Sequence, residues 1–166
     1  MKKAAVVLAG VFFSLVLVAS AHAADKIGYV DLSRSFSEYS KTKGFDKTLS
    51  DKEKAYTSER DKKVADLKSF QDKLNLLNDK EREAKGVELQ NKVKDFQDYD
   101  RQKQADLRKE QEEKMKEILK DIEEAVKEYS EKEGYTIVLN DRVLVYQTKS
   151  MDITDQVIKI LNNSKK

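Results

Sequence analysis

The residue types that usually carry protein chemistry are almost absent from this chain of 166 residues. It has no cysteine, and its single histidine, His22, lies inside an apolar N-terminal segment. If that segment is removed, the chain cannot build a Ser/His or Cys/His nucleophile pair or a histidine metal site. Carboxylates, lysines and serines remain, but no motif gathers them, and no G-x-x-x-x-G-K-[ST] phosphate loop is present. We therefore predict no enzymatic activity, no cofactor and no metal.

The charges of the chain are numerous and balanced. Charged residues make up 39% of the sequence and the mean hydropathy is -0.76, so much of the chain stays solvated and the core must be small. Removing residues 1–23 takes away Lys2 and Lys3 and no acidic residue, which leaves 31 basic and 31 acidic side chains. This balance argues against a mainly electrostatic grip on nucleic acid or anionic lipid.

The N-terminus has the pattern of a secretory signal. Lys2 and Lys3 precede an apolar run that ends in Ala21-His22-Ala23, the small-x-small arrangement of a cleavage site. We predict cleavage between Ala23 and Ala24 and a mature protein outside the cytoplasm. The alternative is a membrane anchor, because the run approaches the length that spans a bilayer.

Residues 41–132 are predicted to form the main element, a long antiparallel helical hairpin. The stretch has no proline and is rich in Lys, Glu, Asp, Gln and Leu, which favour helices. Asn78, followed three residues later by Glu81, resembles a capping box and places the reversal there. A bend is expected at Gly44, before the first arm, and Gly86 is a weaker candidate for a break.

The apolar seam of this hairpin is uneven. Leucines, phenylalanines and isoleucines recur at three- and four-residue spacing, the period of a packed seam, near the tip and again from Met115 to Tyr129. Between them the seam positions include Asp100, Gln104 and Gln111. Two interpretations follow: a weak coiled coil held by its ends, or an arm that flexes.

Residues 24–40 and 133–166 are predicted to form a small β body. The expected elements are a strand over 26–32, a short helical turn over 33–39, strands over 135–139 and 143–146 that form a hairpin after Gly134, and a helix over 152–161. Both hairpin strands are apolar on both faces, and an isolated hairpin cannot cover two apolar faces. We infer that other copies of the chain bury the remainder. The residues expected in this oligomer body are Ile27, Val30, Ile137, Leu139, Val143 and Val145.

The order of these parts resembles the Skp/OmpH family of periplasmic chaperones. The discriminating segments are residues 28–31, 134–140 and 152–154, each placed where the family has it. The resemblance implies an α+β, predominantly α fold, in which a helical hairpin descends like a tentacle from a small β body shared between three subunits and closed by a short C-terminal helix.

The same resemblance implies the function. Family members form homotrimers that hold unfolded outer-membrane proteins between the arms without ATP and prevent aggregation in the periplasm. Contact with anionic lipid or lipopolysaccharide is a further candidate interaction. The neutral charge count argues against it, and no basic lipid-binding motif is evident. Two alternatives are an extracytoplasmic coiled-coil scaffold and, from the Lys-rich first arm, nucleic-acid binding. The export signal and the lack of aromatics between the basic runs argue against the latter.

Client contact is expected at apolar arm residues that cannot all fit a two-helix seam. For each of them, the alternative is simple packing against the other arm. The candidates are Tyr56, Val64, Phe70, Leu76, Val87, Phe96 and Tyr99.

Overall fold

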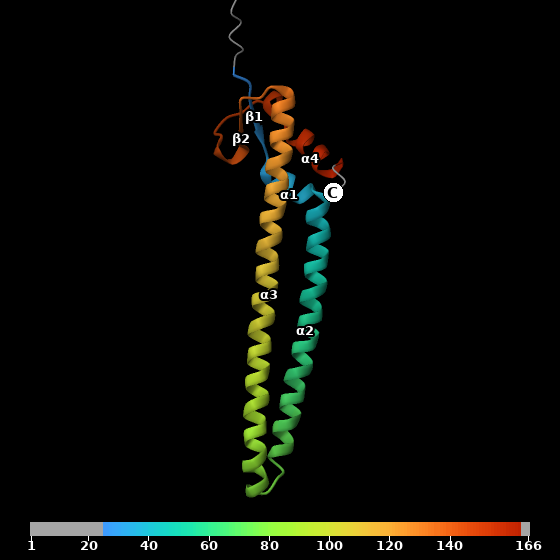
Figure 1. The fold of residues 1–166 in the computed structure, drawn as a ribbon, viewed down its shortest axis with the longest axis vertical. Helices are drawn as coiled ribbons and strands as arrows, with labels where there is room; N and C mark the ends of the chain where they lie inside the picture. Colours follow the sequence, from blue (N-terminus) through green and yellow to red (C-terminus); the bar gives the residue numbers. More distant parts are fainter. Residues whose placement is uncertain (1–24, 164–166) are drawn as a thin grey trace, which may run out of the picture.

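A computed structural model describes residues 25–163, so the predicted signal segment and the Ala23-Ala24 cleavage site lie outside the described residues. The chain forms a small body at one end of a long helical hairpin (Figure 1). This arrangement confirms the predicted fold class. The elements in order are β1 (Ile27–Val30), α1 (Leu32–Glu38), α2 (Ser40–Leu74), α3 (Asp79–Glu133), β2 (Ile137–Asn140), the 3-10 turns η1 (Asp141–Val143) and η2 (Lys149–Met151), and α4 (Thr154–Asn163).

Local capping signals set the ends of the longest helix, α3. At the tip of the hairpin, Asn78 Oδ1 accepts a hydrogen bond from the Glu81 N–H at 3.1 Å, and Asn78 Nδ2 donates to Glu81 Oε2 at 2.8 Å. At the other end Gly134 adopts φ 74°, the left-handed conformation that glycine supplies most easily. Both predicted helix boundaries are confirmed, and Gly86 causes no break.

The predicted bend at Gly44 is wrong, because α2 starts at Ser40 and runs through this glycine. The direction changes instead at Tyr39, whose backbone is extended with ψ 125° and separates α1 from α2. One glycine costs a helix only about 1 kcal/mol, and the good helix formers that follow in a 35-residue helix offset it.

The predicted hairpin of strands 135–139 and 143–146 is also wrong. β2 pairs instead in parallel with β1, with Ile27 opposite Ile137 and Val30 opposite Asn140. After β2, Asn140 caps η1, and this turn leads the chain away from the sheet. No strand of the described chain pairs with residues 143–146, so the exposed fractions of Val143 and Val145 are 68% and 105%.

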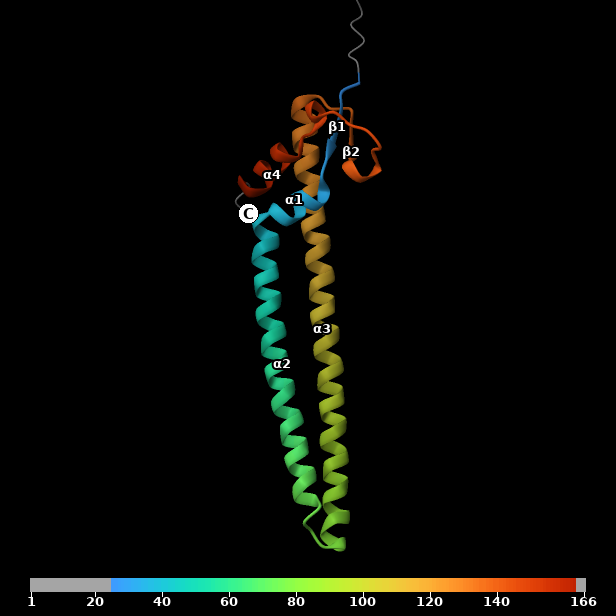
Figure 2. The same ribbon diagram turned by 180° about the vertical axis from the view of Figure 1, so that it is seen from behind.

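The hydrophobic core lies in the body, around the C-terminal part of α3. In both views this part of α3 is flanked by the two-stranded sheet on one side and by α4 on the other (Figures 1 and 2). Ile118, Ile122 and Ala125 project from one face of α3 and are almost fully buried. They pack in one cluster with Val30, Tyr39, Ile153, Val157 and Leu161. A single helix therefore serves as both half of the arm and the centre of the core.

Polar contacts join α2 and α3 where the apolar seam lapses. Asp100 on α3 accepts hydrogen bonds from the Tyr56 hydroxyl at 2.6 Å and from Arg60 Nε at 3.1 Å, both on α2. Gln104 donates to the same carboxylate at 2.9 Å. Farther toward the body, Lys52 forms an ion pair with Glu110 at 2.5 Å. The middle of the arm is therefore held by hydrogen bonds and charge rather than by apolar burial.

Replacing Asp100 with Ala should loosen the middle of the arm and leave the body intact. The substitution removes the shared acceptor of Tyr56 and Arg60, whose loss should cost about 1 kcal/mol at this partly exposed position. Hydrogen exchange of the amides near Tyr56 and Gln104 should accelerate about fivefold. Amides of α4 should exchange as before.

The matched control is Asp98→Ala, because exposed Asp98 pairs only along its own helix with Arg101. Equal exchange in the two variants would show that the Asp100 network does not hold the arm together.

Candidate functional site

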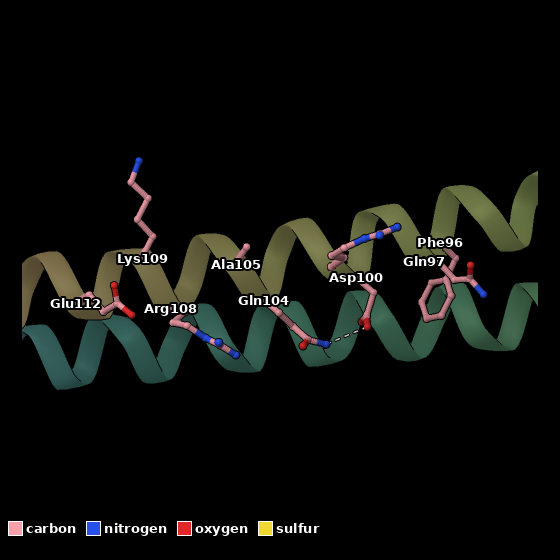
Figure 3. Close-up of a pocket in the computed structure, with 9 residues that line it drawn as sticks. Phe96, Gln97, Asp100, Gln104, Ala105, Arg108, Lys109 and Glu112 are labelled. Carbon is pink, nitrogen blue, oxygen red and sulfur yellow. Dashed lines mark hydrogen bonds between the residues drawn. The ribbon is translucent and has the colours of Figure 1, made fainter.

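An open groove of about 540 Å³ lies along α3 in the arm. Figure 3 shows Gln104 and Asp100 reaching across to the facing helix, while Lys109 points away from both helices. The Phe96 ring lies at one end of the groove. Its lining combines an aromatic ring with amides and charges of both signs: Phe96, Gln97, Asp100, Arg101, Gln104, Ala105, Arg108, Lys109 and Glu112. Such a surface suits weak, unspecific contacts better than one rigid ligand.

A second groove of about 410 Å³ lies nearer the tip and shares Phe96 with the first. It is formed by both helices, with Leu67 and Phe70 from α2 and Lys92 and Phe96 from α3. The Lys92 ammonium lies 5.5 Å from the centroid of the Phe70 ring, a cation–π contact. Phe96 therefore connects two grooves that together extend along the arm from Phe70, toward the tip, to Glu112, toward the body.

Tyr99 occupies a third groove, of about 300 Å³, together with Tyr56. Lys63 Nζ lies 4.6 Å from the centroid of the Tyr99 ring. Burial, and after it the nearby Glu59, raises the pKa of Tyr99 to about 12.

The predicted client-contact residues are spread along the arm rather than gathered at one point. Val64, Leu76 and Val87 are exposed, with Leu76 the most accessible at 86%. The four aromatic candidates are half-buried and line the grooves: Tyr56, Phe70, Phe96 and Tyr99. Aromatic and aliphatic candidates thus differ, because the rings take part in the arm's own packing and the three aliphatic side chains do so much less.

The body carries a larger apolar groove, of about 590 Å³, between α3 and β2. Leu119, Ile122 and Val126 line it from α3, and the β2 residues Ile137 to Asn140 line it from the sheet. Of the residues predicted to form the oligomer body, Ile27, Ile137, Leu139, Val143 and Val145 are exposed. Val30 is not, because it is buried in the chain's own core.

Two further apolar residues of α3 are exposed and were not predicted to be: Leu119, which lines this groove, and Met115, one helical turn before it. Met115 was placed in the arm's seam, yet 41% of its surface is accessible. A signal was present, since Met115, Leu119, Ile122 and Val126 recur at four- and three-residue spacing. Met115, Leu119 and Val126 thus extend the apolar surface around buried Ile122 onto a neighbouring, more accessible side of α3.

The described residues give no sign of a conventional ligand site. Among residues 25–163, no cluster of three or more His, Cys, Asp or Glu side chains could hold a metal ion. In the same range, no helix combines the length and apolar character that crossing a membrane requires. The features that remain are apolar surfaces on the body and mixed grooves on the arm.

The chain is similar to known proteins over nearly its whole length. The family model for outer membrane protein (OmpH-like) matches residues 26–161. The chain is 31% identical over 157 residues to the chaperone protein Skp of Pectobacterium atrosepticum, a match that covers 91% of this chain and 94% of that protein.

A solved structure shares the fold. It belongs to a protein of Caulobacter crescentus described as an OmpH-like outer membrane chaperone, with a TM-score of 0.77 at 15% identity, covering 84% of this chain and 85% of the other. At that identity the likeness concerns the fold alone. The family model and the Skp relative carry the assignment further and confirm the resemblance of the sequence: the chain belongs to the OmpH-like (Skp) family of outer membrane protein chaperones, not to a family of enzymes.

Proposed function

We propose that this protein is an ATP-independent holdase that binds unfolded outer-membrane proteins in the periplasm, as a homotrimer whose arms surround the client. The observation that carries the proposal is the division of exposed apolar surface between two places. One is the body, with its apolar groove between α3 and β2 and its exposed valines, and the other is a set of scattered side chains on long polar arms.

The apolar face of the body is the support for self-association. Ile137 and Leu139 are 46% and 36% exposed, and Val145 is fully exposed. Among the described residues, nothing pairs with the outer edge of β2, because the bridge between Tyr29 and Asp152 lies on the β1 side of the sheet. A free edge and an exposed, strand-prone segment in one chain favour pairing between copies. The number of three copies comes from the family resemblance.

Val145→Asp should dissociate the oligomer without unfolding the subunit. Val145 makes no buried contact in the single chain, so a charge there is tolerated in the monomer but costly in an apolar interface. Sedimentation should show a trimer for the unaltered mature chain and a smaller species for the variant. Asn163→Asp, which adds the same charge at an exposed position of α4, should stay trimeric. An unchanged sedimentation profile for Val145→Asp would remove this face from the interface.

The arms support the second half of the proposal, client binding. An unfolded polypeptide offers many different apolar segments, so its holder needs several adaptable contacts and rapid release. The arm grooves combine aromatic rings with lysines and carboxylates, and Leu76 and Val87 add exposed aliphatic side chains near the tip. These contacts are individually weak, and their number along two helices supplies the affinity.

The direct test is dilution of a denatured outer-membrane β-barrel protein into buffer with the mature chain and no nucleotide. Light scattering should be suppressed at about three chains per client, one trimer. Scattering that stays unchanged with a well-folded oligomer would favour the extracytoplasmic scaffold, to which the polar network between α2 and α3 would then give a rigid arm.

Leu76→Ser combined with Val87→Ser should weaken client binding several-fold while the arm stays folded. Both side chains are exposed, so their loss should change the free energy of unfolding by less than about 0.5 kcal/mol. The matched control is Lys80→Ser with Glu83→Ser, which truncates two exposed polar residues of the same tip and keeps the net charge. Equal suppression of scattering by both variants would exclude the tip as a contact surface.

A further inference from the structure

The first arm helix leaves the body through a very short corner. Only Tyr39 separates the last residue of α1 from the first residue of α2. With 35 residues, α2 extends about 50 Å, so a turn of about 10° at this corner moves its far end by about 9 Å. Whatever fixes the backbone at residues 38–40 therefore fixes the direction of the arm.

The start of α2 is capped from a distant part of the chain. Tyr39, the N-cap residue, uses its hydroxyl to donate to Asp121 at 3.1 Å rather than to cap the helix. The cap comes from Asn162, near the end of α4. Asn162 Oδ1 accepts hydrogen bonds from the Ser40 N–H at 2.8 Å and from the Ser40 hydroxyl at 2.7 Å.

The same amide also holds the end of α1. Asn162 Nδ2 donates to the Glu38 carbonyl oxygen at 3.2 Å. The first N–H groups and last carbonyl groups of helices lack intrahelical partners, and here one side chain serves one of each. A single residue thus connects both sides of the corner to α4.

Core packing fixes where Asn162 lies. The preceding residue, Leu161, is 4% exposed and belongs to the same buried cluster as Tyr39 and Ile122. Rotation of α4 would remove Leu161 from the core and Asn162 from the corner together. The docking of α4 is therefore transmitted to the start of the arm.

A separate ionic contact joins α2 to α3 but not to α4. Lys41 Nζ lies 2.7 Å from Glu117 Oε1 and 2.7 Å from Asp121 Oδ2. Hydrogen bonds from Lys114 and then Lys41 lower the pKa of Glu117 to about 2, so this carboxylate stays ionised even in moderately acidic solution. It keeps the two arm helices together at their base whether or not Asn162 is in place.

We propose that Asn162 is the positioning residue that sets the angle between the arm and the body, by capping α2 from the docked C-terminal helix. This role goes beyond client binding, because it concerns the orientation of the arm relative to the body and not the residues that contact a client.

The test compares Asn162→Ala with Asn162→Asp and Asn163→Ala. Alanine removes both the acceptor and the donor, whereas aspartate keeps the acceptor for Ser40 and places a favourable charge at the start of a helix. Asn163 is exposed and one position further along α4, which makes it the matched control. Because the chain has no cysteine, spin labels can be attached at Leu76→Cys near the tip and Lys159→Cys on α4, with labelled subunits diluted into unlabelled ones.

Two readouts distinguish positioning from general stability. For Asn162→Ala, the distance distribution between the labels should broaden, and the amides of residues 43–45 should exchange about fivefold faster, the factor typical of a lost N-cap. Asn162→Asp should restore both toward the unaltered protein, and Asn163→Ala should change neither. A distribution for Asn162→Ala as narrow as that of the unaltered chain would overturn the proposal. So would a loss of thermal stability in the same variant with no change in the arm.

Discussion

The continuity of α3 is the constraint on which the rest of this structure depends. Its first half forms one side of the arm, and its second half places Ile118, Ile122 and Ala125 at the centre of the body. The sheet and α4 pack on this second half, and α2 runs beside α3 from the tip as far as Asp121. Bending α3 would therefore disturb the core. The other arm helix has no such connection, because it enters the body through the single residue Tyr39.

The sequence predicted the elements that depend on local signals. The cap at Asn78 and the glycine at 134 are local hydrogen-bonding and backbone preferences, and the structure confirms both. The sequence did not predict the pairing between distant segments. The parallel contact of Ile27 with Ile137 leaves no trace in either strand, and the strand propensity of residues 143–146 does not reveal that no partner lies within the chain. The predicted bend at Gly44 is wrong for the opposite reason: the local helix-breaking tendency of one glycine is outweighed by the helix-favouring residues around it.

The candidate site was only partly predictable. Apolar residues that exceed the needs of a two-helix seam could be counted from the sequence, and Leu76 and Val87 are indeed exposed. Which aromatic rings pack into the arm depends on how α2 faces α3, and the contacts between the two helices, such as those of Tyr56 and Arg60 with Asp100, join residues far apart in sequence. The sequence left two interpretations of the polar interruption of the seam, a weak coiled coil held by its ends or an arm that flexes. In the structure, hydrogen bonds join the two helices there.

The parallel pairing of β1 with β2 has a consequence for the order in which the molecule forms. Contacts between residues far apart in sequence are slow to form, because the intervening chain must first be closed into a loop. Here that loop is the helical hairpin. Its turn is formed by neighbouring residues, and its two helices can pair progressively from the tip toward the body. This pairing of the helices brings Val30 and Asn140 together, so the two strands need not find each other at the ends of a long flexible chain. The apolar groove of the body is lined by both α3 and β2, so this surface exists only after the two ends of the hairpin have come together.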